Sequence, residues 1–302
     1  MFEFNPILVK ELRSRMRGAR AFVLLTVYLL ILSSVTLLLY SGMASNLGSD
    51  LNAGRQIGKA LFLVVAAVAL VEVCVITPAL TSGSIAGEKE RQTFDLLVAS
   101  LLSPWQIVWG KLASALAFVL LLILAVVPVM SLAFLFGGVS AAEVLIALAG
   151  LVATAVFYAS VGLFWSSVTR SSLGATSFAL GSIIMLLLGV PFLVVIFSLV
   201  FTRDVSSDLL ESVLFIYASR LFIATHPFIA LGVTESQLSS GGGPFFEVVT
   251  TSGAELLVPS PWILYVLLSA LFSITLVALS VRMLQPSPPP PPSARWQPRE
   301  PA

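Results

Sequence analysis

The chain has 302 residues, of which 58% are hydrophobic and only 10% are charged. Soluble domains carry roughly 25% charged residues, so this composition excludes an ordinary soluble protein and indicates an integral membrane protein that contacts the lipid bilayer. The net charge of +1 offers no basic excess for nucleic acid, and one cysteine with one histidine excludes an internal disulfide and the usual cysteine- or histidine-rich metal sites.

Residues 1–20 predict an amphipathic helix lying on the membrane surface. Pro6 is typical of a first helical position, and Leu8, Leu12 and Met16 then fall on one face. The opposite face carries the cations Lys10, Arg13, Arg17 and Arg20. An apolar face toward lipid and cations toward the headgroups are typical of an interfacial helix. The alternative is a basic leader without a defined shape.

Six apolar stretches are long enough to cross a bilayer as helices, because a hydrocarbon core of about 30 Å needs about 20 residues. They are Ala21–Tyr40, Ala60–Leu80, Leu112–Phe136, Val144–Trp165, Leu173–Phe201 and Ile263–Met283. Together they make residues 21–283 an all-α membrane domain, since isolated strands leave backbone groups unpaired in lipid. Two alternatives are a cleaved secretory signal in place of the first span, and a seventh span before the last one.

The distribution of Lys and Arg predicts the orientation of these spans. With the N-terminus in the cytosol, most basic residues lie on the cytosolic side, and only Arg55, Lys59, Arg203 and Arg220 lie outside. The positive-inside rule therefore predicts a multi-pass protein of the cell membrane, plasma or inner, with both termini cytoplasmic.

The cytosolic segment 81–111 is expected to form an elbow of two short helices. Gly83 and Gly87 are expected to end the second span, and an amphipathic helix should follow. Its apolar face holds Phe94, Leu97, Val98 and Leu101, and its charged face holds Glu88, Arg91 and Asp95. These mixed charges beside an apolar face indicate a docking surface for another protein. A solvated loop that merely joins two spans is the alternative.

The second helix of the elbow is expected to start at Ser103 as N-cap, with Pro104 as its first residue. Trp105 and Trp109 follow at positions typical of an aromatic belt, and Lys111 is expected to extend its amine toward the membrane surface.

The segment 202–262 is expected outside the membrane. From Leu209 to Val233 it is mostly apolar, but charged residues, a histidine and a proline interrupt it, which favours two short helices, re-entrant or lying on the surface. Gly241–Pro244 predicts a flexible turn. The proline-rich tail 284–302 is expected to be extended or disordered in the cytosol.

Glu72 is the ionisable residue placed well inside a span, where a charge costs about 2.5–3.5 kcal/mol on insertion scales. It is therefore expected to avoid lipid and to line a translocation path or a helix contact. An ion-coupled secondary transporter that uses Glu72 is one functional hypothesis. A protonated or shallower carboxyl without a functional role is the alternative.

No nucleotide-binding or catalytic motif is found. The nearest approach to a P-loop, Gly54–Ala60, has the wrong spacing and lacks the final Ser or Thr. The chain is therefore expected not to be an enzyme, to need no cofactor, and to take its energy from another chain or from an ion gradient.

Two motifs resemble the permease subunits of type-2 ATP-binding-cassette exporters. One is the leader Asn5–Arg13, and the other runs from Gly87–Leu97 through Ser103–Pro104 to Ile107–Leu112. The family layout is similar as well, with an interfacial leader, six spans, an elbow after the second span and short outer helices before the sixth.

The resemblance implies that the elbow is a coupling helix that docks onto a separate ATPase subunit, and that two permeases, identical or different, pair. Its contact candidates are then Glu88, Glu90, Arg91, Thr93 and Asp95. Gln92 stands where the family often has glycine. The leading hypothesis is thus a permease of an ATP-driven exporter. A non-transporting subunit of a membrane complex is a further alternative, and no residue pattern selects a substrate.

Overall fold

The computed structural model describes residues 6–16, 19–47, 53–94, 102–201, 212–251 and 254–285. Six helices in these ranges are long and apolar enough to cross a membrane. They are α2 (Ala19–Leu47), α3 (Ala53–Glu90), α5 (Pro104–Leu135), α6 (Ala141–Val168), α7 (Ser172–Phe201) and α11 (Pro261–Met283). Each one matches an apolar stretch of the sequence, so the prediction of a helical membrane fold with six spans is confirmed.

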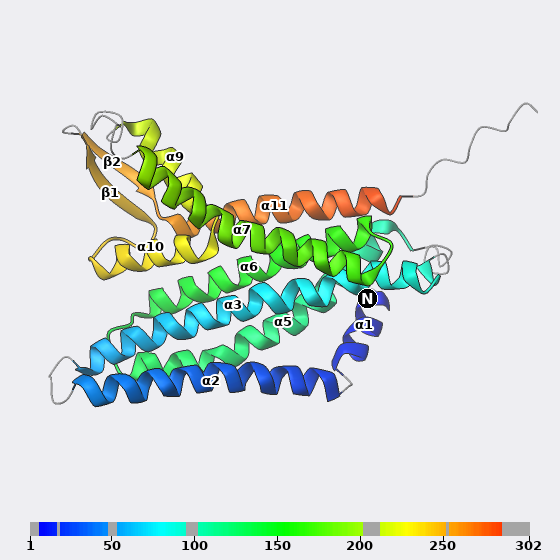
Figure 1. Cartoon of the computed structure of the whole chain (residues 1–302), viewed down its shortest axis with the longest axis horizontal. Coiled ribbons are helices and arrows are strands. Elements are labelled where there is room, and N and C mark those ends of the chain that lie inside the picture. Colours follow the sequence, from blue (N-terminus) through cyan, green and yellow to red (C-terminus); the bar gives the residue numbers. More distant parts are fainter. Residues whose placement is uncertain are drawn as a thin grey trace, which may run out of the picture.

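The long helices lie side by side along the long axis of the molecule (Figure 1). The central one is α3, which contacts α2, α5, α6 and α7. The main apolar core forms around it, where Val65 and Ala69 of α3 meet Leu122 of α5 and Leu151 of α6. Few residues in the most apolar windows of α2 and α7 are buried, so these two helices expose wide apolar surfaces.

The two ends of the bundle differ (Figure 1). At one end α1 (Pro6–Met16) runs across the ends of the long helices, and we name this the α1 end. At the opposite end lie α10 (Pro227–Ser239) and an antiparallel hairpin of β1 (Phe246–Thr251) and β2 (Ala254–Pro259), and we name this the hairpin end.

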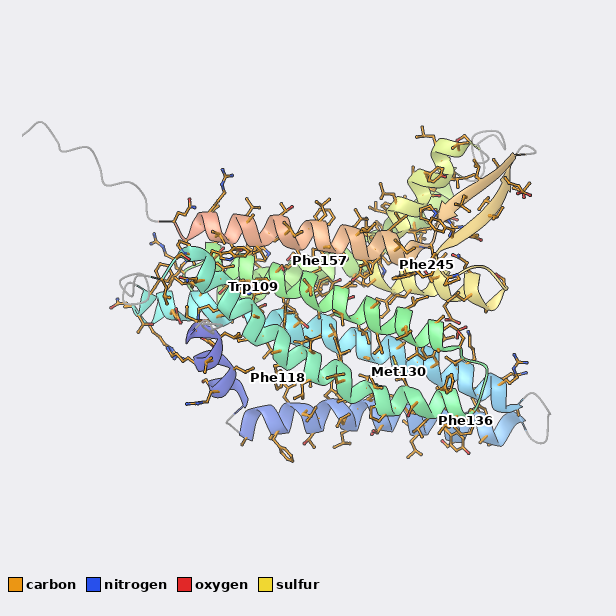
Figure 2. The ribbon with its side chains drawn as sticks, turned by 180° about the vertical axis from the view of Figure 1, so that it is seen from behind. Trp109, Phe118, Met130, Phe136, Phe157 and Phe245 are labelled. Atoms are coloured by element: carbon orange, nitrogen blue, oxygen red, sulfur yellow. The ribbon has the colours of Figure 1, made fainter. Side chains whose placement is uncertain are left out.

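The course of α5 links these ends. Seen from behind, it passes from Trp109 near the α1 end through Phe118 and Met130 to Phe136 near the hairpin end (Figure 2). Phe118 and Met130 are buried in the main core, whereas Trp109 is half exposed. The indole of Trp109 stacks on that of Trp105, with ring centroids 5.8 Å apart.

The leader forms a helix as predicted, but its buried face differs from the expected one. Ile7 is buried in an apolar cluster with Ile107 and Leu112 of α5, whereas Leu8 and Leu12 are only partly buried. The face of α1 that packs is thus selected by the apolar surface of α5 as well as by amphipathic spacing. The side chains of Met16, Arg17 and Arg20 lie outside the described residues.

The prediction that Gly83 and Gly87 end the second span is wrong. The helix α3 continues through both to Glu90. A Cβ at Gly87 would lie 3.2 Å from Ser172 Oγ, at the start of α7. Gly87 therefore serves close packing between two helices rather than chain reversal.

The second half of the elbow also differs from the prediction. Ser103 is the N-cap as expected, and it forms a capping box with Gln106. The helix that follows is continuous with the third span, from Pro104 to Leu135, rather than a separate short helix. The predicted amphipathic helix falls mainly on residues 95–101, which lie outside the described residues.

The expected pair of short helices is present as α9 (Val213–Ile223) and α10. His226, at the turn between them, is buried. Its Nδ1 accepts a hydrogen bond from Ile229 N–H, so the proton of the neutral ring lies on Nε2. The Nε2–H group donates to Leu187 O, 3.1 Å away. Leu187 lies halfway along α7, so the turn between the two helices reaches into the bundle. Ala230 of α10 is buried there, whereas α9 has no buried residue. Gly241, with φ +85°, turns the chain toward the hairpin. A turn at Gly241–Pro244 was predicted from the sequence, but the two strands that follow it were not.

The helices α3 and α6 cross closely. A Cβ at Gly162 of α6 would lie 2.1 Å from Thr81 Oγ1 and 2.9 Å from Pro78 O, both on α3. Only glycine permits this approach. By contrast, nothing lies within 4 Å of a Cβ at Gly42 of α2.

We expect Gly162→Ala to lower the free energy of unfolding by about 1–3 kcal/mol, because the added methyl overlaps α3. The matched control is Gly42→Ala, which should be neutral or stabilising by up to about 1 kcal/mol, since alanine favours helix. Thermal unfolding of the purified proteins in one detergent measures both. Equal stability of the two variants would contradict the close crossing.

Candidate coupling site

Lys111 joins three helices at the α1 end. Its Nζ lies 2.8 Å from Glu88 Oε1 of α3, 3.2 Å from Glu11 Oε1 of α1 and 2.9 Å from Ser84 O. The lysine side chain is only 1% exposed. The prediction that it reaches toward the membrane surface is therefore wrong. A buried ammonium needs acceptors, and here the acceptors lie inside the bundle.

An apolar cluster surrounds this ion pair. Ile85 of α3, Leu163 of α6 and Val277 of α11 pack in it with the residues of α1 and α5 described above. Water is thereby kept from one side of the Lys111 ammonium, which strengthens its attraction to both carboxylates. The cluster and the ion pair together fix the relative positions of five helices.

The last turn of α3 ends in a Schellman motif. Thr93 N–H donates to Glu88 O at 2.9 Å, and Gln92 N–H donates to Lys89 O at 3.1 Å. This motif places its penultimate residue in the left-handed region, and Gln92 has φ +57°. Glycine is favoured in that conformation, which gives a physical reason for the glycine that the family resemblance leads one to expect there.

A second set of contacts ties the end of α3 to the α6–α7 turn. Lys89 Nζ donates to the carbonyls of Ser167 and Thr169, at the end of α6. Glu90 Oε2 accepts a hydrogen bond of 3.0 Å from Ser172 N–H, the first residue of α7. A carboxylate at a helix N-terminus is favoured by the unpaired N–H groups and the helix dipole. The end of α3 is therefore held on two sides.

The predicted contact residues occupy different positions within this end. Glu88 faces inward to Lys111, and Glu90 caps α7. Arg91 and Thr93 are exposed. Asp95 lies outside the described residues. The structure thus brings four of the five together, and three of them are exposed, although the Glu90 carboxylate is already bonded to the start of α7.

Sequence reasoning did not identify Glu11 or Lys111 as site residues. The two are separated by 100 positions, and spacing along the chain gives no sign of their contact. The available signal was Glu11, the one acidic residue among the cations of residues 5–20.

Glu72 lies between helices, away from this site. It is 9% exposed, and neither carboxyl oxygen has a hydrogen-bond partner among the described residues. The nearby Tyr28 hydroxyl of α2 is also without one. A buried polar group without a partner is costly, so this is a polar spot on the contact between α2 and α3. Within the described ranges, no three His, Cys, Asp or Glu side chains could share a metal ion.

The family model described as ABC-2 family transporter protein matches residues 5–291. A search of curated proteins found no match. The matched range includes α1, all six long helices, the end of α3 and the hairpin.

We expect Lys111→Met to lower the free energy of unfolding by about 3 kcal/mol, because two carboxylates lose their shared cation inside the protein. Lys10→Met is the matched control, since Lys10 is exposed on α1 and should change stability little. Chemical denaturation in detergent checks both. A Lys111→Met protein as stable as the control would show that the ion pair contributes nothing.

We expect Gln92→Gly to raise the free energy of unfolding by about 0.5–1 kcal/mol, since glycine adopts the left-handed conformation without steric cost. The same substitution at Gln56, an exposed position inside α3, should lower it by about 1 kcal/mol. Opposite signs in one thermal-shift series support the Schellman end. A loss of stability at both positions would count against it.

Proposed function

Because the chain belongs to the ABC-2 family of transporter proteins, we propose that this membrane-spanning permease works in an ATP-driven exporter and is driven by a separate ATPase at the end of α3. In this proposal the protein lies in the cell membrane, and the ATPase contacts the α1 end, which faces the cytosol. The family relationship implies an ATPase partner, and the export direction follows from the resemblance of the motif Gly87–Leu97.

The observation that carries the proposal is the two-sided attachment of the α3 end. On one side Lys111 links it to α1 and α5, and on the other side Lys89 and Glu90 link it to α6 and α7. A force applied at Arg91 or Thr93 would pass directly into four other helices. Coupling of this kind needs a contiguous set of packed and hydrogen-bonded elements, and these contacts supply one.

The segment that follows would complete the docking surface. Phe94 packs partly against the apolar cluster at the α1 end, and its ring lies 5.7 Å from Lys89 Nζ. We propose that the chain from Phe94 toward Asp95 extends the contact surface that Arg91 and Thr93 begin, as the resemblance implies.

We further propose that a second permease packs on α7. Ser177 and Gly181 are exposed and four residues apart, a spacing of small residues that allows two membrane helices to approach closely. Large apolar side chains flank them, among which Phe178 and Met185 are 55% and 78% exposed. A pair formed here would cover a surface that one chain leaves open.

The experiment is co-expression of the chain with ABC ATPase subunits from its own genome, followed by co-purification and an ATPase assay in lipid. Arg91→Glu should lower the amount of bound ATPase at least tenfold, because it reverses an exposed charge at the contact. Arg282→Glu, an exposed charge reversal near the end of α11, is the matched control and should bind as wild type. Equal binding by both variants would reject the α3 end as the contact.

The same preparation tests the ion-coupled alternative. Transport that stops in Glu72→Gln, but continues after ATP depletion at a maintained ion gradient, would replace the ATP-driven proposal. Glu72 has no described charged partner and lines neither cavity described below, so we expect Glu72→Gln to keep ATP-dependent transport.

A further inference from the structure

Two adjoining cavities lie at the hairpin end, between α3, α6 and α10. The inner one, which we name the slot, has a volume of about 140 Å³ and is lined mainly by apolar side chains, among them Phe62, Leu70, Phe228 and Leu231. The outer one, the vestibule, has about 760 Å³ and is lined by Arg55, Gln56, Lys59 and Ser140, among others. Leu63, Glu143 and Leu238 line both, so the two adjoin.

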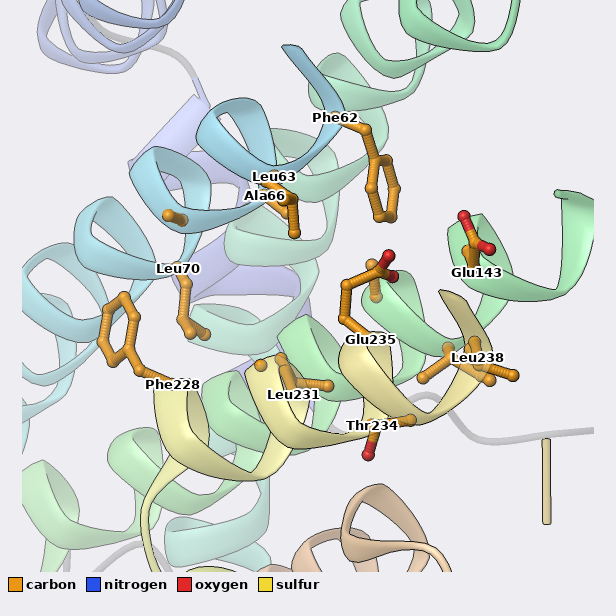
Figure 3. A pocket seen from close by; sticks show the side chains of 14 residues that line it. Phe62, Leu63, Ala66, Leu70, Glu143, Phe228, Leu231, Thr234, Glu235 and Leu238 are labelled. Carbon is orange, nitrogen blue, oxygen red and sulfur yellow. The ribbon is translucent and has the colours of Figure 1, made fainter. Parts of the chain in front are cut away.

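Charged groups gather where the slot meets the vestibule. Figure 3 shows the Glu235 carboxylate of α10 and the Phe62 ring pointing into the slot, with Glu143 of α6 beside them. Lys59 Nζ of α3 pairs with Glu235 and lies 3.1 Å from Glu143 Oε2. Both carboxylates are largely buried, since the Glu143 side chain is 9% exposed and the Glu235 side chain is 12% exposed.

The charges at this boundary do not cancel. Two carboxylates share one ammonium, which leaves one negative charge at the mouth of an apolar cavity. Arg55 lines only the vestibule and is exposed, so water screens its charge from the slot. A cation entering from the vestibule would complete the balance, whereas an anion would meet two carboxylates.

The volume of the slot limits the apolar part of a ligand. An engineered apolar cavity of about 150 Å³ stays dry and binds benzene. The slot is of that size and lies over about two helical turns of α3, from Phe62 to Leu70. One aromatic ring or a short branched alkyl group would fill it, while the attached charge stays near Glu235.

We propose that this cavity binds a small hydrophobic cation, namely a primary ammonium that carries one aromatic ring or an alkyl group of similar size. The ring occupies the slot between Phe62 and Leu231, and the ammonium donates hydrogen bonds to Glu235 and Glu143. The site lies at the end of the bundle opposite the coupling site, and binding there needs no ATPase.

The test is isothermal titration calorimetry on the full chain in lipid nanodiscs, with phenethylammonium as the probe and empty nanodiscs as the correction for partitioning. Saturable binding is expected, with an affinity at least tenfold higher than that of 2-phenylethanol and no binding of phenylacetate. Equal affinity for the alcohol and the ammonium would overturn the assignment of a cation site.

Two variants locate the site by independent means. Glu235→Gln removes the excess negative charge and should weaken phenethylammonium binding at least tenfold; Glu255→Gln, an exposed carboxylate on β2, is its control and should not. Ala66→Leu fills the slot and leaves every charge in place, and it should abolish binding, whereas Ala117→Leu on an exposed face of α5 should not. Binding that survives in Ala66→Leu overturns the proposal even if Glu235→Gln fails to fold.

Because no ATPase is present in these titrations, their outcome is separate from that of the proposed coupling. A chain that binds phenethylammonium but no ATPase would support the slot as a cation site and would contradict the proposed ATP-driven transport. A chain that binds its ATPase but not phenethylammonium would support the proposed coupling and would contradict the cation site.

Discussion

A lysine ammonium inside a membrane protein needs acceptors, and the α1 end of this bundle is arranged around that need. Lys111 takes its acceptors from the leader and from α3, so the leader is held to the protein by charge as well as by the apolar contact of Ile7. The same cation orients Glu88 inward, away from solvent. The Schellman end and the contacts to the α6–α7 turn can form where they do because the last turns of α3 are already fixed in position.

The opposite end repeats the arrangement with the roles exchanged. There α3 supplies the lysine, Lys59, and two neighbouring helices supply the carboxylates Glu143 and Glu235. Both ends of the central helix are thus joined to their neighbours by one ammonium shared between two glutamates. In the middle of the bundle, the close crossing at Gly162 constrains the rotation of α3 against α6. The charged groups at the two ends add to that constraint, since they bond only in one register.

The six spans could be predicted from the sequence because lipid imposes a length and an apolar composition on each of them. The ends of the helices could not, because partners distant in sequence decide them. Gly87 resembles a helix stop until Ser172 is seen beside it, and Lys111 resembles a membrane-surface lysine until Glu11 is placed 3.2 Å away. The hairpin did have a local signal, the β-branched residues of Phe246–Thr251, but the sequence analysis made no prediction for this segment. Of the candidate site, the position was predictable, whereas the division into buried and exposed residues was not.

The length of α3 has a mechanical consequence. At 38 residues it is about 57 Å long, nearly twice the thickness of the hydrocarbon core. It is therefore long enough to act as a lever, with two arms that extend beyond the bilayer. A tilt of about 5° around its midpoint would displace each tip by about 2.5 Å, in opposite directions, for a rod of this length. Lys59 lies on one arm and Glu88 on the other. A small tilt produced on one side of the membrane would therefore move the ion pair on the far side by about the length of a hydrogen bond.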